Sequence, residues 1–244
     1  MIRRFVMKNS KSPYLIAGFL IIMGFFSTFC LEAGQVYQLT FTSRYIWRGF
    51  DMNPPNKPVL QPSITFDFGK SGIALNLWGS FSFENKQVNE TDLTLSYTFK
   101  TPESYSLSVG FTHYGWYFAK PFKLKNNTSQ EVYISAGLPK AFLNPKVTVY
   151  YDFNNGDGTY VVLALAHSLK LSEKLVTDLS ASLGYNGRQW INQSGFSDLN
   201  FGAAVPFNLD KVTISPFINI TFILMDAVNP GIDNELTIGA SLWF

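Results

Sequence analysis

Residues 37–50 read YQLTFTSRYIWRGF, and this stretch sets a pattern that the rest of the chain repeats. Side chains of a β-strand point to opposite faces at successive positions, so alternating apolar and polar residues give a strand one apolar and one polar face. The apolar set is Tyr37, Leu39, Phe41, Tyr45 and Trp47, and the polar set is Gln38, Thr40, Thr42, Arg44 and Arg48. The stretch therefore predicts a single strand with two arginines on its polar face.

A targeting segment precedes this strand. Arg3, Arg4, Lys8 and Lys11 form a basic head, an apolar run covers residues 14–29, and small residues suitable for cleavage follow. This three-part layout predicts a secretory signal peptide over residues 1–33, removed after Ala33, and a mature domain over residues 34–244. Two alternatives are an uncleaved membrane anchor, for which the run is short, and a lipoprotein acylation site at Cys30, where Phe29 fits poorly.

The charge of the chain belongs largely to that segment. The formal net charge is +2, and removing residues 1–33 takes away four basic residues and Glu32, which leaves 15 basic against 16 acidic residues. A domain without a clustered basic face is not expected to bind nucleic acid. The single cysteine excludes an intramolecular disulfide.

The mature chain has the composition and periodicity of an all-β protein. Aromatic residues make up 16% of the sequence, and helical periodicity is absent. Apolar and polar residues alternate in twelve segments, near residues 37–50, 60–68, 73–83, 93–99, 105–112, 132–138, 147–154, 161–169, 175–186, 199–207, 212–222 and 236–244. We therefore expect an antiparallel up-and-down β-barrel of twelve strands.

The connections alternate between a short and a longer set. The short turns are residues 69–72, 100–104, 139–144, 170–174 and 206–211, and they are rich in lysine. Short turns at one end and long loops at the other are typical of outer-membrane barrels, in which the short turns are periplasmic. The longest loop, residues 116–129, is basic and is expected at the cell surface.

A soluble barrel or sandwich would show the same alternation with its apolar face turned inward. Aromatic residues at the ends of the apolar faces favour a membrane barrel, because such rings gather at the two membrane interfaces. The rings are Tyr37, Phe68, Phe99, Tyr105 and Phe207 near the short turns, and Trp47, Phe83, Phe153, Tyr185 and Phe222 near the longer loops. The chain is thus expected in the outer membrane of a Gram-negative bacterium, in contact with its lipid.

The last strand supports this assignment. Ala240, Leu242 and the final Phe244 share one face. This ending resembles the C-terminal signal that the barrel-insertion machinery of Gram-negative bacteria recognises, so these residues are the predicted assembly signal. Pro62 and Pro216 fall within predicted strands, where a closed barrel has no free edge for a missing donor. We expect bulges there, and the barrel has ten strands if either segment is not a strand.

Residues 43–66, SRYIWRGFDMNPPNKPVLQPSITF, resemble the start of the uncharacterised TorF-like outer-membrane family. Ser43, Tyr45, Arg48 and Gly49 occupy the positions of its Ser-x-Tyr-x-x-Arg-Gly stretch, which is followed by a proline-containing loop and a second amphipathic strand. The resemblance implies a barrel of unsettled role and supplies no catalytic residues.

Strand direction places a set of charged residues at one height in the lumen. The expected pore-lining residues are Arg44, Arg48, Asp92, Glu131, Asp152, Asp198 and Glu235. Closure of the last strand on the first brings Glu235 near the arginines. These charges predict either a constriction that orients a small polar solute or a salt-bridge network that holds the lumen shut. Tyr114, Trp78, Tyr133, Tyr150 and Phe217 are expected to fill part of the lumen.

The favoured function is a narrow passive channel for small polar solutes. One alternative is an outer-membrane lipid-modifying hydrolase, which would use a lipid-facing His and Ser. His113 and His167 fall on the apolar face, but no Ser shares a strand face beside either of them. The other alternative is a closed structural or adhesive barrel that acts through its loops. No spacing of metal ligands or glycine-rich phosphate loop is present, so we expect no enzyme activity, metal or cofactor.

Overall fold

The computed structural model describes residues 34–117, 127–173 and 175–244. The predicted signal peptide, residues 1–33, lies outside these residues, as does most of the basic loop, including Lys120, Lys123 and Lys125. Among the described residues there is no helix with the length and apolar character needed to cross a membrane.

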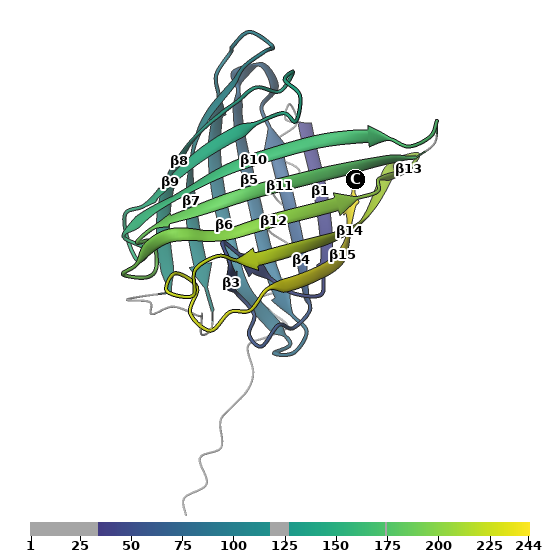
Figure 1. The fold of residues 1–244 in the computed structure, drawn as a ribbon. Coiled ribbons are helices and arrows are strands. Elements are labelled where there is room, and N and C mark those ends of the chain that lie inside the picture. The colour runs from purple at the N-terminus through teal and green to yellow at the C-terminus, as the bar shows by residue number, and fades with distance from the viewer. Residues whose placement is uncertain (1–33, 118–126, 174) are drawn as a thin grey trace, which may run out of the picture. The chain divides into compact units, whose positions relative to one another are not determined.

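Twelve strands of the described chain form the wall of a closed antiparallel barrel (Figure 1). They are β1 (Gly34–Thr42), β4 (Val59–Asp67), β5 (Ile73–Ser82), β6 (Gln87–Thr98), β7 (Ser106–Trp116), β8 (Thr128–Gly137), β9 (Lys146–Asp152), β10 (Gly158–Lys170), β11 (Val176–Gly187), β12 (Ser194–Ala204), β14 (Val212–Ile223) and β15 (Glu235–Trp243). Each pairs with its neighbours along the chain, and β1 pairs with β15 to close the barrel. The predicted fold class and strand number are confirmed.

Three short elements lie outside this wall. A 3₁₀ turn, η1 (Gly69–Ser71), joins β4 to β5, and β13 (Phe207–Leu209) forms a small hairpin with the start of β14. The pair β2 (Ile46–Trp47) and β3 (Phe50–Asp51) forms a separate two-stranded sheet. We call the segment from Ser43 to Lys57 that carries this pair the inner hairpin.

The expected faces of the wall strands are confirmed. Large apolar side chains are exposed on the outside of almost every strand, whereas Thr, Ser, Asn and acidic side chains are buried inside. Most of the rings expected at the two ends of the barrel are exposed, namely Phe68, Phe99, Tyr105, Phe207, Phe83, Phe153, Tyr185 and Phe222. An apolar exterior around a hydrated interior is the construction of a membrane barrel.

Both barrel prolines are accommodated without the expected bulges. The register of β4 against β5 is the same on either side of Pro62, and that of β14 against β12 and β13 is the same on either side of Pro216. At each proline, the pairing with one neighbouring strand is interrupted and then resumes in the same register. The recorded register shifts lie elsewhere, between Ser80 and Phe81 and between Leu183 and Tyr185.

The five short turns lie at one end of the barrel together with Gly34 and Phe244, and we call this the turn end. The opposite end, which we call the loop end, holds the inner hairpin and the segment that joins β14 to β15. The connections at the loop end differ in length. The β5–β6 connection spans only Phe83–Lys86, and the β9–β10 connection spans only Phe153–Asp157.

Candidate functional site: a lumenal cavity beneath an inner hairpin

The first predicted strand is too long. The wall strand β1 ends at Thr42. The last backbone hydrogen bond before the chain leaves the wall runs from the amide of Ser43 to the carbonyl of Ile238, over 2.9 Å. The chain then turns into the lumen. Tyr45 and Trp47, expected against lipid, lie inside the barrel instead, where both line the lumenal cavity.

The tip of the inner hairpin is a tight turn at Arg48 and Gly49. Both residues have positive φ, 51° and 79°, as in the two-residue turns of right-twisted hairpins. Arginine is an unusual residue for this conformation, so contacts elsewhere in the barrel must hold it.

Arg48 reaches across the lumen to Glu131 on β8. Its Nη1 and Nη2 donate to the two carboxylate oxygens over 2.6 and 2.9 Å. The Arg48 side chain is 7% exposed and that of Glu131 is 0% exposed. Glu131 also accepts hydrogen bonds from Tyr114 Oη at 2.8 Å and from Gln189 Nε2 at 2.7 Å. Because every member of this network has partners, the buried charges are well compensated.

Aromatic rings surround the same guanidinium. Its central carbon lies 4.3 Å from the ring centroids of Trp47 and Tyr150 and 4.7 Å from that of Tyr160. Burial disfavours the charge, but the neighbouring Glu131 outweighs burial and raises the pKa of Arg48. The tip of the hairpin is therefore held by a permanent buried cation.

The backbone of the tip is anchored as well. The Arg48 carbonyl accepts a hydrogen bond from Asn229 Nδ2 at 3.0 Å and lies 2.9 Å from Ser197 Oγ. A Cβ at Gly49 would stand 2.7 Å from Asn229 Nδ2, so the turn also needs glycine for space. Ser197 belongs to β12 and Asn229 to the β14–β15 connection, so the backbone of the tip is fixed to this side of the barrel at its loop end.

The base of the hairpin is held at Glu235 on β15. Arg44 forms an ion pair with Glu235, and Asn56 Nδ2 donates to the same carboxylate at 2.7 Å. Asp51 accepts hydrogen bonds from the amides of Asn53 and Asn56 at 3.0 and 2.7 Å, which shapes the following loop. The predicted proximity of Glu235 to the arginines is confirmed through Arg44.

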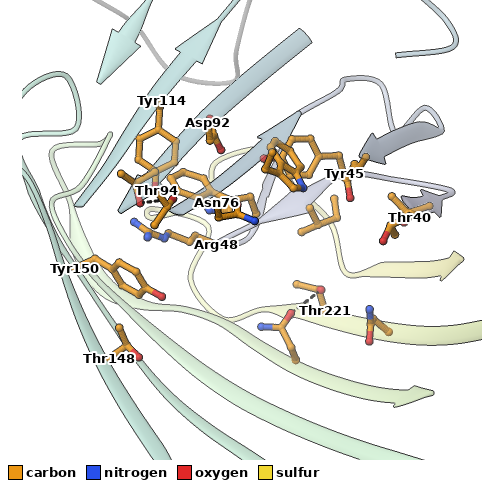
Figure 2. Close-up of a pocket in the computed structure, with 18 of the residues that line it drawn as sticks. Thr40, Tyr45, Arg48, Asn76, Asp92, Thr94, Tyr114, Thr148, Tyr150 and Thr221 are labelled. Carbon is orange, nitrogen blue, oxygen red and sulfur yellow. Dashed lines mark hydrogen bonds between the residues drawn. The ribbon is translucent and has the colours of Figure 1, made fainter. Parts of the chain in front are cut away.

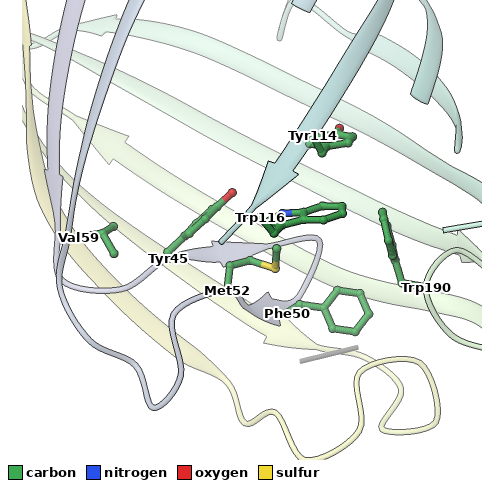
Figure 3. Close-up of a cluster of buried hydrophobic side chains, with 7 residues drawn as sticks. All are labelled: Tyr45, Phe50, Met52, Val59, Tyr114, Trp116 and Trp190. Atoms are coloured by element: carbon green, nitrogen blue, oxygen red, sulfur yellow. The ribbon is translucent and has the colours of Figure 1, made fainter. Parts of the chain in front are cut away.

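Apolar side chains fill the space between the hairpin and the wall at the loop end. The cluster consists of Tyr45, Phe50, Met52, Val59, Tyr114, Trp116 and Trp190 (Figure 3). Trp116 and Trp190 meet edge to face with ring centroids 5.2 Å apart, and Tyr114 stacks on Trp116 at 5.6 Å. This cluster and the Arg48 network make the hairpin a packed part of the barrel.

Below the hairpin lies a polar cavity of about 740 Å³. Its lining combines Trp78, Tyr114, Tyr133 and Tyr150 with Thr, Ser and Asn side chains from strands around the barrel (Figure 2). All five aromatic residues predicted to occupy the lumen, Phe217 included, line this cavity.

The predicted pore-lining residues separate into two groups. Arg44, Arg48 and Asp92 line the cavity, and Glu131 and Glu235 lie behind the arginines as their partners. Asp152 and Asp198 are buried on the inner side of the wall but serve structural roles. Asp152 accepts hydrogen bonds from Ser129 Oγ and from the amides of Asn154 and Gly156, and Asp198 accepts from Tyr160 Oη at 2.8 Å and from Asn200 Nδ2 at 2.6 Å.

Gln189 and Asn229 complete the Arg48 network and Trp190 belongs to the apolar cluster, but none of the three was predicted. All three lie in segments that the sequence presents as loops between strands. Gln189 is fixed by Asn186, whose Oδ1 accepts from the Gln189 amide at 2.7 Å. Polar and aromatic residues in a connection carry no periodic signal, and their inward direction depends on the folded path of the chain.

Neither histidine is hydrogen-bonded to a serine in the described part of the chain. His113 Nδ1 is hydrogen-bonded to Gln130 Nε2 at 3.0 Å, and the ring of His167 packs against Phe142 at 5.3 Å. Among the described residues there is no group of three His, Cys, Asp or Glu side chains suited to a metal ion.

No family model and no curated protein matches the sequence. Solved structures do match the fold. The structure of the NanC porin is 8% identical with a TM-score of 0.54, and the match covers 86% of this chain and 99% of that one. The KdgM porin is 11% identical with a TM-score of 0.55 and coverages of 86% and 98%.

A third match is the COG4313 outer membrane channel from Pseudomonas putida F1, at 10% identity, a TM-score of 0.50 and coverages of 87% and 94%. At these identities the likeness concerns the fold. Together with the apolar exterior of the closed barrel, it shows that this chain is an outer-membrane β-barrel.

Proposed function

We propose that the barrel is a narrow passive channel for small polar solutes and that the inner hairpin sets its narrowest point. The observation that carries this proposal is the polar cavity of about 740 Å³ inside the lumen. Charges and hydroxyl groups turned inward, rather than a packed apolar core, are what a water-filled passage requires.

The hairpin is expected to act as a fixed constriction. Expelling it would break the buried Arg48–Glu131 pair, at a cost of about 3–5 kcal/mol. Exposing the side chains of Phe50 and Met52 would add roughly 1.5–3 kcal/mol each. Since about 1.4 kcal/mol corresponds to a factor of ten in population, the displaced state would be rare.

We place the route of solutes past the hairpin on the Arg44 side. The side chain of Arg44 is 33% exposed, whereas that of Arg48 is almost fully buried. Thr221 and Thr237 line the cavity from the neighbouring strands β14 and β15. Solutes would therefore pass beside the Arg44–Glu235 pair, along the wall formed by β14, β15 and β1.

The second candidate is a closed barrel that works through its loops. The dense anchoring of Arg48 favours it, because such a network can equally hold the lumen shut. The hydrolase reading has no comparable support, since His113 and His167 contact Gln130 and Phe142. We also propose that the chain belongs to the TorF-like family. In this fold its motif positions Ser43, Tyr45, Arg48 and Gly49 would build the inner hairpin.

Conductance of the purified barrel in planar bilayers tests the channel. Thr94 lines the cavity and its neighbour Leu95 faces outward, so Thr94→Trp and Leu95→Trp form a matched pair. We expect single-channel steps for the wild type, a clear reduction for Thr94→Trp and little change for Leu95→Trp. A folded wild-type barrel without conductance would establish the closed alternative, and equal effects of the two variants would show that current does not cross the lumen.

A further inference from the structure

The two sides of the lumenal cavity differ in chemistry. Strands β5, β7, β8 and β9 contribute the rings of Trp78, Tyr114, Tyr133 and Tyr150. On the other side, β12, β14, β15 and β1 contribute mainly hydroxyl and amide groups, such as Asn219 and Thr237. Figure 2 shows Tyr114 and Tyr150 on one side of the cavity and Thr221 and Thr40 on the other.

The charges of the cavity are largely neutralised within the protein. Arg44 is paired with Glu235 and Arg48 with Glu131. The other charged lining residues are one acid, Asp92, and one base, Lys146. A charged solute would thus lose hydration without gaining a net opposite charge, which is unfavourable. The balance of charges favours an uncharged solute.

The polar side offers groups that can both donate and accept hydrogen bonds. Thr40 and Ser241 share a hydrogen bond of 2.8 Å, and the Thr221 hydroxyl donates to Asn200 Oδ1 at 2.7 Å. A hydroxyl group has one donor and two acceptor positions, so each pair keeps capacity for a ligand. Such a surface matches a solute that carries many hydroxyl groups.

The aromatic side of the cavity suits the apolar C–H faces of such a solute. Tyr133 and Tyr150 lie with ring centroids 5.6 Å apart at an angle of 49°, and Trp78 lies 5.6 Å from Tyr45 of the hairpin. Sugar rings present apolar C–H faces that pack on aromatic rings, while their edges carry hydroxyl groups. The cavity volume is within the range of about 300–1,000 Å³ found for small-molecule sites.

We propose that the lumenal cavity is a binding site for uncharged carbohydrate, with sugar rings against Trp78, Tyr133 and Tyr150 and hydroxyl groups toward the Thr and Asn side chains opposite. This deepens the proposed function by naming the solute class. The site itself requires only that a solute reaches the lumen from either end of the barrel.

Calorimetric titration of the folded barrel in a detergent without a sugar headgroup tests this site. The neutral probes are sucrose, maltose and raffinose, and the counter-probes are glucuronate and triglycine. We expect saturable binding of at least one neutral sugar and at least tenfold weaker binding of both counter-probes. Absence of saturable binding to all three sugars would overturn the proposal, as would equal or tighter binding of glucuronate or triglycine.

Two substitutions locate the bound sugar. Trp78→Ala removes a ring from the cavity, whereas Tyr97→Ala removes an exposed ring from the outside of β6. Affinity should fall about tenfold or more in Trp78→Ala and stay within twofold in Tyr97→Ala. Equal effects would place the sugar outside the cavity and overturn the proposal. If Trp78→Ala does not fold, Tyr133→Ala provides the second variant, in which loss of the ring should weaken binding about tenfold or more.

The binding result is separable from the channel result. Titration in detergent does not depend on conduction across a membrane. A barrel that conducts ions but binds no neutral sugar overturns the carbohydrate site and leaves the channel in place. A barrel that binds sugar without conductance supports the site and overturns the channel.

Discussion

Arg48 and Glu131 meet through two hydrogen bonds of 2.6 and 2.9 Å, although the two residues are 83 positions apart in the sequence. The pair joins the tip of the inner hairpin to the opposite wall of the barrel. Planar bidentate pairing is the strongest form of an arginine–carboxylate contact. Together with the Arg44–Glu235 pair and the apolar cluster, this contact holds the chain after β1 inside the lumen.

Loss of the carboxylate at this contact should destabilise the barrel. Glu131→Gln leaves the Arg48 cation buried without its counter-charge, and we expect a loss of about 3–5 kcal/mol. The matched control is Glu103→Gln, which removes the carboxylate of an exposed ion pair with Lys140 and should cost about 0–1 kcal/mol. Thermal unfolding, followed by heat-modifiable gel mobility, measures both. Equal melting temperatures for the two variants would contradict the structural importance of the Arg48 network.

The turn glycine provides a second test of the hairpin. Gly49 and Gly231 both have positive φ, 79° and 71°, so alanine is strained by a similar amount at either site, roughly 1–2 kcal/mol. A Cβ at Gly49 would collide with Asn229, whereas nothing lies within 4 Å of one at Gly231. Gly49→Ala should therefore lower the unfolding temperature clearly more than Gly231→Ala. An equal decrease would mean that Asn229 moves aside at little cost.

Alternation of residues was sufficient to predict the wall of the barrel. It specified the strand number and which residues share a face, because a strand in a closed wall has one lipid face and one lumenal face. The aromatic rings at the ends of the apolar faces then indicated that these faces point outward and the acids inward. The aromatic residues of the lumen, such as Trp78 and Tyr150, followed from the same rule.

The path of residues 43–58 could not be predicted by that rule. Tyr45 and Trp47 alternate with polar residues just as the wall strands do, but they belong to a hairpin inside the lumen. The turn between β2 and β3 uses Arg48, which lacks the Asn-Gly or Asp-Gly signal typical of such turns. Its conformation depends on Glu131 and Asn229, which are distant in sequence, so local pattern carries no information about it.

The direction of the barrel in the membrane is a further prediction. Lysine-rich turns are expected on the periplasmic side, so the turn end should face the periplasm and the loop end the cell surface. Cysteines introduced singly at Asn127 and Ser172, which are both exposed and lie at opposite ends, should react differently with an impermeant reagent on intact cells. Labelling is expected at Asn127 alone. Equal labelling, or labelling at Ser172 alone, would reverse or refute the orientation.

The C-terminal residue is expected to serve assembly. The amide of Phe244 donates to the carbonyl of Tyr37 at 3.0 Å, so this residue lies in the seam where the barrel closes. Phe244→Asp should reduce the amount of folded barrel in the outer membrane and leave export to the periplasm intact. Phe142→Asp, which changes an 80% exposed ring in a turn, is the control and should insert normally. Normal levels of folded Phe244→Asp barrel would argue against Phe244, Leu242 and Ala240 as the assembly signal.

The two arginines of the hairpin should have different effects on conductance and stability. Arg44 is partly exposed beside the proposed route, so Arg44→Ser removes a fixed positive charge and leaves a space through which water can solvate Glu235, whose own side chain is 5% exposed in the wild type. Charges at the narrowest part of a low-dielectric passage control ion selectivity. We therefore expect Arg44→Ser to raise conductance and shift the reversal potential in a salt gradient toward cations, with a small change in unfolding temperature.

Arg48→Ser should show the opposite balance, because it leaves the fully buried Glu131 without its cation and releases the tip of the hairpin. The unfolding temperature should fall strongly, and channel openings should become larger and more variable as the hairpin loosens. Reversal potentials and unfolding temperatures measured side by side distinguish the two roles. If Arg44→Ser leaves selectivity unchanged while conductance appears in Arg48→Ser alone, the hairpin is a plug and the wild-type barrel is closed.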